Sequence, residues 1–380
     1  MKKQTFTLSS RIAMILIAAS ATSQAFAYEQ IVRPYQSVRT SGMGGVFETT
    51  GLYDQNFFGN PARVCANPTW RLTLLDISAE ADTTAISNTG TISNVIKGSG
   101  NIVQDAASTA GSNNHARIQT VMPAWYLPPS MSHKWGLGIA LITSTQADLG
   151  LRNNYSIDDQ AYVDIGPAIT FGRTFLEDDS LAVGITGHFV DRLNTTSPVS
   201  ISNLLSGFSF SPTTSGGSGV MIDADVGVTK RLSHWHPWGL DVELAFALDN
   251  VANGNFSQGA LFLKAPNQAQ SMYRSYGGGI SFHRESIGIL RDPVLAVETS
   301  DIGTRNANGS FYRTLHMGAE TRLISILLGR VGINQGYLTA GVGLDLRLLQ
   351  IDFATYGEEL GLNAGDMQDR RYAIRVGLQL

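Results

Sequence analysis

The sequence predicts an all-β protein: a transmembrane antiparallel β-barrel of about fourteen strands with an amino-terminal plug, or hatch. Apolar and polar residues alternate along most of the chain, turn signals recur without an interdomain linker, and 40 of the 380 residues are glycine. Only 15% of the residues are charged. After the amino-terminal leader, no stretch approaches the roughly 18 apolar residues that a membrane helix requires. A sheet that separates water from lipid explains this composition better than a bundle of membrane helices.

The clearest alternation lies at the carboxyl terminus. One register of residues 338–348 is apolar and consists of Leu338, Ala340, Val342, Leu344, Leu346 and Leu348. The other register contains Asp345 and Arg347, and the final stretch repeats the pattern around Ile374 and Arg375. Because successive side chains of a strand point to opposite faces, one face suits lipid and the other suits water.

The same alternation locates the other wall strands. We expect them at residues 70–79, 116–127, 134–144, 161–173, 180–192, 220–231, 238–248, 271–283, 291–300, 311–322, 325–333, 337–347, 349–357 and 370–380. The connections after even-numbered strands are short, whereas those after odd-numbered strands are mostly longer and polar, including residues 193–219, 249–270 and 358–369. Short periplasmic turns alternating with longer extracellular loops are typical of bacterial barrels.

The register that faces inward carries most of the charge. The lumen-lining residues are predicted to include Asp164, Asp223, Asp225, Asp241, Glu243, Glu320, Arg322, Asp345, Arg347 and Arg375. Such side chains can simply solvate a lumen and pair across it, or they can hold a plug and line a path. A soluble β-sandwich is the alternative fold, but its inner faces would not carry so many charges.

The amino terminus provides a targeting signal. Lys2, Lys3 and Arg11 surround the start of an apolar stretch that ends in a small-residue cleavage motif at Ala25 and Ala27, so we expect residues 1–27 to be a secretory signal peptide. The single cysteine, Cys65, rules out an internal disulfide. With one thiol, we expect neither a structural zinc site nor a cysteine redox pair.

Residues 28–69 lack strand alternation and precede the barrel, which we expect to span residues 70–380. They are rich in Gly, Pro and Asn and are predicted to fold into the lumen as a hatch. Their sequence 41–47 (SGMGGVF), followed by Asn60-Pro61-Ala62, resembles the amino-terminal signature of FadL-type outer-membrane proteins. Segments 315–320, 332–336, 341–344, 356–361 and 369–372 are also similar, and the resemblance leans toward the PorV-like and TraF-annotated members.

This resemblance implies a fourteen-stranded barrel closed by the hatch. In the transport branch, it implies that a hydrophobic ligand meets the hatch and leaves sideways into the bilayer where a strand kinks. The hatch residues that match the signature are Gly42, Met43, Gly44, Gly45, Phe47, Asn60 and Pro61. The glycines permit either ligand contact or a packed turn, and Asn60-Pro61 indicates a turn before the first strand.

Several other functions find little support. The net charge of −4 and the absence of a Lys/Arg cluster argue against a nucleic-acid partner. His234 and His236 lack a visible third metal ligand, and no catalytic motif is readable, so we expect neither an enzyme nor a cofactor. The Ser/Thr-rich segment 79–114 can form a short amphipathic helix over the barrel mouth or remain disordered.

The sequence therefore favours a transporter or channel for hydrophobic or amphipathic small molecules in the outer membrane of a Gram-negative bacterium. The alternative is a secretion- or conjugation-associated barrel that binds a protein partner through its extracellular loops. The expected partners are the outer-membrane lipid bilayer, the barrel-assembly machinery, and either a hydrophobic small molecule or a secreted protein. The chain ends in Leu380, whereas such barrels commonly end in an aromatic residue.

Overall fold

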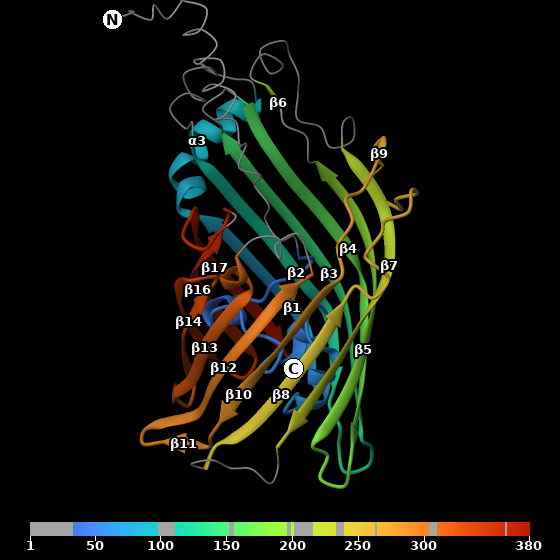
Figure 1. The fold of residues 1–380 in the computed structure, drawn as a ribbon, viewed down its shortest axis with the longest axis vertical. Coiled ribbons are helices and arrows are strands. Elements are labelled where there is room, and N and C mark those ends of the chain that lie inside the picture. The colour runs from blue at the N-terminus through green and yellow to red at the C-terminus, as the bar shows by residue number, and fades with distance from the viewer. Residues whose placement is uncertain are drawn as a thin grey trace, which may run out of the picture.

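The wall is a single antiparallel sheet that closes on itself (Figure 1). The computed structural model describes residues 33–97, 111–151, 156–195, 199–200, 216–232, 239–262, 264–303, 310–361 and 363–380. The long strands are β1 Arg71–Asp82, β2 Asn113–Leu127, β3 Trp135–Leu151, β4 Ser156–Phe175, β5 Leu181–Thr195, β7 Gly217–Arg231, β8 Asp241–Asp249, β10 Ser275–His283, β12 Leu290–Ile302, β13 Leu315–Ile324, β14 Leu327–Asn334, β15 Tyr337–Asp345, β16 Leu349–Glu359 and β17 Gln368–Gln379.

Each long strand pairs with its two neighbours in the chain, and β1 pairs with β17 from Thr73–Gln379 to Asp82–Arg371. Within the described residues, these 14 strands form one closed antiparallel barrel, which confirms the predicted fold class. Each corresponds to one strand expected from the alternation. Closure matters because a closed sheet has no edge whose N–H and C=O groups would remain unpaired in lipid.

The two faces of the wall differ as the alternation predicts. On β17, Ile374 is 47% exposed on the outside, whereas Ala373 and Arg375 are 2% and 3% exposed on the inside. The exterior of the barrel carries other large apolar side chains, including Leu338, Val331, Ile169 and Phe246. A closed, even-stranded barrel with an apolar exterior is the architecture of outer-membrane proteins, and we place this protein in the outer membrane of a Gram-negative bacterium.

The barrel is taller on one side than the alternation indicates. Strands β3 and β4 continue to Leu151 and begin at Ser156, so most of the loop expected between residues 144 and 161 is strand. Figure 1 shows β2–β5 and β7 rising well above β8, β10 and the later strands. The sequence signal fades there because Ser144, Gln146 and Asp148 face inward while Thr145 and Ala147 replace large apolar residues on the outside. Strand pairing continues after the lipid-facing pattern has ended.

The shorter elements lie around the barrel ends. They are α3 Thr83–Lys97, the two-residue strands β6 Val199–Ser200, β9 Asn267–Gln268 and β11 Ser286–Ile287, and the 3-10 helix η5 Phe311–Thr314. Helix α3 lies at the long-loop end, within the segment for which a helix or disorder was expected (Figure 1). The predicted strand 311–322 was wrong at its start, because residues 311–314 form η5. The predicted signal peptide and the histidines at 234 and 236 lie outside the described residues.

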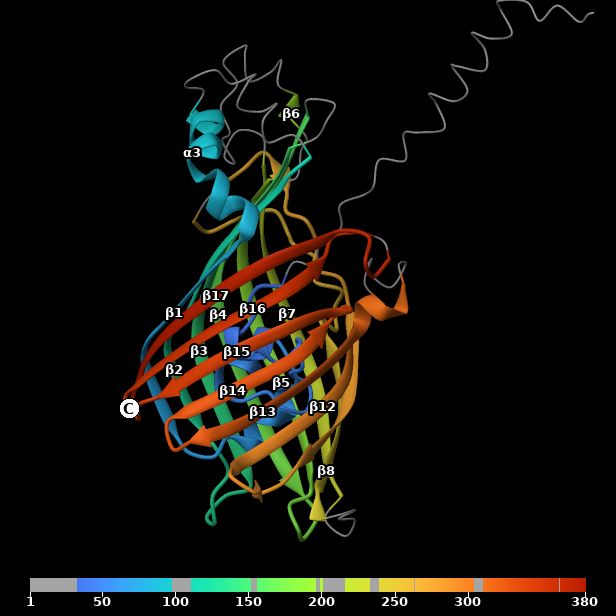
Figure 2. The ribbon, with the colours of Figure 1, turned by 90° about the vertical axis from the view of Figure 1, so that its left-hand side faces the viewer.

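The segment before β1 lies inside the barrel. It contains a short helix, α2 Val38–Gly42, and two 3-10 helices, η1 Tyr53–Asn56 and η2 Pro61–Ala66. Figure 2 shows this segment in blue within the lower half of the lumen, enclosed by the strands. Helix α2 contacts β14–β17, and η2 contacts β3–β5 and β7 on another part of the wall. We call residues 33–69 the hatch. No helix in the described part of the chain combines the length and apolarity needed to cross a membrane.

The exterior assignment predicts a large effect at Ile374. Replacement of Ile374 by Arg should lower the free energy of unfolding by about 2–4 kcal/mol, because it places a charge in lipid. Replacement by Leu should change it by less than about 1.5 kcal/mol. Urea titrations of the refolded protein in lipid vesicles measure both values. Equal values for the two variants would mean that β17 faces the other way.

Candidate ligand path at the hatch and the adjoining wall

The hatch glycines allow the backbone to approach the wall closely. Gly44 and Gly45 have positive φ values of 72° and 82°. A Cβ atom on Gly44 would overlap the backbone of Met317 and Ile333, and one on Gly45 would lie 2.7 Å from the His316 ring. Only glycine adopts this conformation at this distance without strain. These residues therefore act as a packed turn against β13 and β14.

One wall carboxylate holds the next hatch residues. Glu298 on β12 accepts hydrogen bonds from the backbone N–H groups of Phe47, Glu48 and Thr49 at 2.6, 2.8 and 2.8 Å. The Thr49 hydroxyl also donates to it. Hydrogen bonds to an ionised acceptor are stronger than neutral ones. Glu298 is 2% exposed, so solvent does not compete for these bonds.

A ladder of alternating charges crosses the lumen beside the hatch. It runs in sequence through Arg39, Glu320, Arg330, Asp352 and Arg375, and Arg375 then pairs with both Asp76 and Asp54. The ladder begins and ends on the hatch, at Arg39 and Asp54, and the five residues between them come from β13, β14, β16, β17 and β1. Removing one partner of a buried pair costs about 3–5 kcal/mol. The ladder therefore fixes the position of the hatch within the wall.

A second charged network lies closer to the long-loop end. His115 is fully buried, and its ring nitrogens lie 2.6 Å from Asp148 and 2.7 Å from Glu80. Because carboxylate oxygens only accept hydrogen bonds, both ring nitrogens must donate, and the ring is an imidazolium. Arg117 and Arg371 complete the balance of charge around Glu80. This network braces β1, β2, β3 and β17.

One sector of the lumen is apolar instead of charged. The hatch residues Tyr53 and Phe57 pack on Tyr126 of β2, with ring centroids 5.4 and 5.7 Å apart. Val121, Ala124, Ala140, Ile142 and Ala168 of the wall and Tyr35 of the hatch complete this buried group, which we call the aromatic cluster. Burial, followed by the neighbouring Asp54 carboxylate, raises the pKa of Tyr35 well above its usual value, so the cluster stays neutral.

The wall is interrupted next to the aromatic cluster. Strands β1 and β2 pair up to Thr73–Ala124 and resume pairing at Ile77–Thr120, which leaves residues 74–76 without partners on β2. The register of β2 against β3 also shifts between Val121 and Ala124. Pro123 lies within this stretch and cannot donate a ladder hydrogen bond. We call the unpaired stretch the seam. On the exterior, Leu74 and Trp125 of the two strands are 48% and 40% exposed, whereas on the lumen side the seam contains Asp76, which is 2% exposed and pairs with Arg375.

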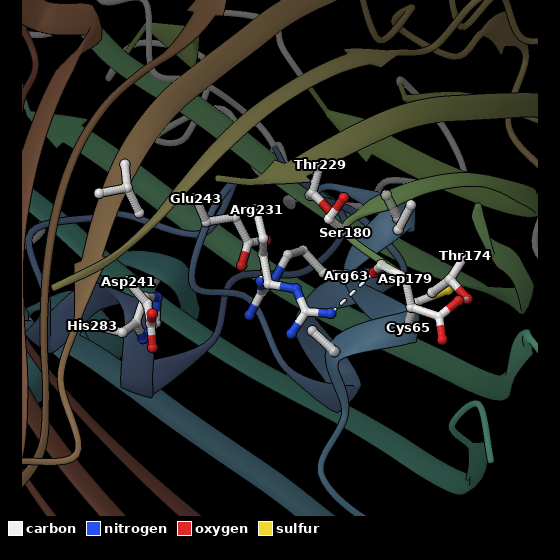
Figure 3. Close-up of a pocket in the computed structure, with 14 residues that line it drawn as sticks. Arg63, Cys65, Thr174, Asp179, Ser180, Thr229, Arg231, Asp241, Glu243 and His283 are labelled. Carbon is white, nitrogen blue, oxygen red and sulfur yellow. Dashed lines mark hydrogen bonds and ion pairs between the residues drawn. The ribbon is translucent and has the colours of Figure 1, made fainter. Parts of the chain in front are cut away.

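A polar cavity of about 370 Å³ lies at the short-turn end, between η2 and strands β5, β7, β8 and β10 (Figure 3). Its lining includes Arg63, which pairs with Glu243 at 2.5 Å, and Arg231, which donates to the Asp179 carbonyl at 3.0 Å. Cys65 also lines it, and burial raises the pKa of its thiol to about 12. The charged lining suits water and ions.

The structure separates the sequence-predicted site residues into groups. Gly42 contacts Gly341, Met43 is fully buried, and Phe47 lines a cavity of about 20 Å³ on the hatch. Asn60 caps η2 by accepting from Ala62 N, and Pro61 packs against Gly184 and Gly227. None of these hatch residues belongs to the aromatic cluster as described here.

The predicted lumen residues fall into two groups, one inside the barrel and one at its short-turn end. Asp164, Asp223, Asp225, Glu243, Glu320 and Arg375 lie inside the barrel. Asp241, Arg322, Asp345 and Arg347 lie at the short-turn end, where Asp241 lines the polar cavity and Arg347 is in the turn between β15 and β16. Alternation identifies the face of a side chain but not its height along the strand.

The sequence interpretation overlooked the residues of the aromatic cluster. Tyr53, Phe57 and Tyr126 were not singled out, although Pro123 inside a predicted strand already indicates a break in pairing. Glu298 lies in the inward register of its strand and would have been found by the rule that identified the other lumen charges. Among the described residues, no group of three His, Cys, Asp or Glu side chains could hold a metal ion.

Comparisons with solved structures identify barrels of similar size. The chain is similar to the TodX monoaromatic hydrocarbon channel (11% identity, TM-score 0.46), covering 91% of this chain and 98% of that one. It is similar to the Ralstonia pickettii toluene transporter TbuX (12%, 0.48), covering 90% and 96%. A Pseudomonas aeruginosa FadL homologue gives 10% identity and a TM-score of 0.37, covering 92% and 99%. No protein-family profile and no curated protein matches the sequence. None of these three is a PorV-like or TraF-annotated protein, so that narrower expectation stays a prediction.

The Glu298 contacts predict how the hatch responds to mutation. Replacement of Glu298 by Ala leaves three backbone N–H groups without an acceptor, at a cost of about 1.5–3 kcal/mol for hydrogen bonds to a charged group. The barrel should still assemble, but its ion conductance across a planar bilayer should rise. Replacement of the exposed Glu285 by Ala is the control. A Glu298→Ala barrel as silent as the unmodified protein would show that the hatch is held elsewhere.

Proposed function

We propose that the protein transports a hydrophobic or amphipathic small molecule across the outer membrane and releases it sideways through the seam between β1 and β2. The observation that carries this proposal is the position of the aromatic cluster directly behind the seam. An apolar molecule among Tyr53, Phe57 and Tyr126 would face lipid through a stretch of wall that lacks its ladder hydrogen bonds. Transfer from one apolar environment to another avoids the cost of exposure to water.

The rest of the lumen disfavours a straight passage to the periplasm. The polar cavity and most of the charge ladder lie between the hatch and other parts of the wall, and the ladder reaches the seam at Asp76. An uncharged apolar solute would have to displace water from these groups without replacing its hydrogen bonds. In this proposal the short-turn end faces the periplasm, residues 28–69 act as the hatch, and residues 70–380 form the barrel.

Tyr53 is the hatch residue best placed to respond to a ligand. Its φ is 54°, a conformation that an aromatic residue adopts at a cost of about 1–3 kcal/mol. The Asn67 side chain holds its backbone N–H at 2.8 Å, and the Arg71 guanidinium lies 3.5 Å from its ring centroid. A ligand that displaces the ring from Tyr126 would release this strain. Movement of Tyr53 would then uncover the seam.

A disulfide across the seam tests the proposal. Leu75 faces Met122 in the register set by the flanking pairs, so Leu75→Cys/Met122→Cys in a Cys65→Ser background should close the seam on oxidation. Uptake of radiolabelled toluene and oleate by intact cells should fall to the level of cells without the protein, and dithiothreitol should restore it. The control, Val342→Cys/Phe353→Cys, links a regularly paired position of β15 and β16 and should leave uptake unchanged. Unchanged uptake with a fully formed seam disulfide would exclude this route.

A second candidate function is binding of a protein partner at the long-loop end. Leu261, Phe262, Phe311 and Tyr312 are between 63% and 67% exposed, and the Asp191 carboxylate fixes the first two through their backbone N–H groups. Exposed large apolar side chains in loops can form interaction surfaces. If this is the function, Leu261→Ser/Phe262→Ser should abolish secretion of the partner, whereas oxidation of the seam cysteines should not affect it.

A further inference from the structure

Glu48 is an acid on the hatch that the wall encloses without pairing. Its side chain is 0% exposed, and neither carboxyl oxygen has a hydrogen-bond partner among the described residues. It occupies the space that a side chain at Gly277 of β10 would fill, since a Cβ there would overlap Glu48 Oε1. The backbone on either side is fixed, because Glu298 binds the N–H of Glu48 and Asn60 binds its carbonyl at 3.2 Å. The carboxyl group therefore has no freedom to turn toward water while the hatch is seated.

The charged groups around Glu48 are mostly negative. The elements packed against it contribute Asp249 from β8, Glu298 and Asp301 from β12, and no side chain from Gly277 on β10. Within the described part of the chain, the cation that faces it is Arg33 of the hatch, which is ion-paired with Asp301. The carboxylate oxygens of Glu298 accept their hydrogen bonds from the same hatch segment and donate none to Glu48. An ionised Glu48 would thus be buried, lack hydrogen bonds, and face like charges.

These conditions separate the two protonation states of the seated hatch. A neutral carboxyl group costs the free energy of its missing hydrogen bonds only, whereas an isolated buried carboxylate costs far more. In water, outside its pocket, the same group ionises readily. The free energy of an ionised Glu48 can therefore fall only if the hatch moves away from β10 and β12.

We propose that Glu48 is a proton-binding latch: the hatch is seated on β10 and β12 while Glu48 carries a proton, and loss of that proton releases it. The carboxyl O–H bond breaks, the proton goes to water, and the carboxylate moves from the pocket over Gly277 into the aqueous lumen. The latch acts on the plug itself and does not depend on which molecule crosses the seam.

The direction of the pH dependence follows from the surroundings. Burial, and then Asp249, Glu298 and Asp301, raise the pKa of Glu48 well above its usual value, and Arg33 lowers it. An acid whose pKa is raised in the seated state stabilises that state below its unperturbed pKa, and this contribution is lost as pH rises toward the raised value. The hatch should accordingly loosen with increasing pH. Acid conditions should keep it closed.

Conductance of the full-length protein in planar bilayers, measured from about pH 5 to about pH 9, tests the latch. In the unmodified protein the open fraction should increase with pH by up to about tenfold per pH unit, the limit for one linked proton. Glu48→Gln keeps the shape but cannot ionise, and it should stay closed and insensitive to pH. The matched control Glu177→Gln changes an exposed turn residue and should retain the full pH response.

Two further variants keep the test independent of how Glu48→Gln packs. Gly277→Ala removes the space for the carboxyl group and should conduct even at low pH. Asp249→Asn removes one acidic neighbour of Glu48 and should show a smaller increase at high pH. Heat-modifiable migration on gels verifies that each barrel is folded. An equal pH response in Glu48→Gln and the unmodified protein, or a flat response in the unmodified protein, would overturn the proposal, whereas failure of the seam disulfide to block uptake would not affect it.

Discussion

The structure depends on the neutralisation of buried charge inside a closed wall. The barrel can be closed and apolar outside only if the inward register is polar, and a narrow lumen then holds many charges away from bulk water. The ladder solves this problem by alternating sign from Arg39 to Arg375, where two acids share one guanidinium, and by using hatch residues at both ends. The wall strands contribute Glu320, Arg330, Asp352, Arg375 and Asp76, so removal of the hatch leaves partners of Glu320 and Arg375 missing. The hatch thus fills the lumen and also compensates charges of the barrel wall.

The lumen is divided by chemistry. Charged networks occupy most of its circumference, and the aromatic cluster occupies the sector behind β2–β4. This division places an apolar group of wall and hatch residues at the point where the β1–β2 ladder is interrupted. Strands β4 and β5 also lack pairs at Gly166 and Pro167, but there the wall carries a buried ion pair, Arg192–Asp164, whose two bonds are 2.7 and 2.6 Å long. Regular pairing and full charge compensation make a rigid wall, whereas a proline, a register shift and dispersion contacts make a deformable one.

Glu48 and Glu298 show how two acids of one type take opposite roles in one place. Glu298 accepts three backbone N–H bonds, so its negative charge is compensated by directed dipoles. Glu48 supplies one of those backbone donors, but its own carboxyl group has no hydrogen bond and lies over Gly277. The first carboxylate attaches the hatch, and the second makes that attachment depend on a proton. Because they are close together, the hydrogen bonds of Glu298 and the negative charge of an ionised Glu48 act on the same few hatch residues.

The sequence by itself determined the barrel class, the number of wall strands and the face on which each side chain lies, because the period of two is a local property of the extended chain. It also indicated that the segment before β1 is not a strand, and its glycines at 44 and 45 anticipated a close approach. Only the tertiary structure decided which inward charges meet, because Arg39 and Glu320 are far apart in the chain. The inward register of the ladder also includes Arg322, Asp345 and Arg347, but these residues lie at the short-turn end of the barrel. The seam and the aromatic cluster were likewise decided there, because they require the hatch, β1 and β2 to be brought to the same height. Alternation carries no information on the height of a residue along the barrel, on the register between strands, or on contacts between distant segments. The candidate site depends on all three.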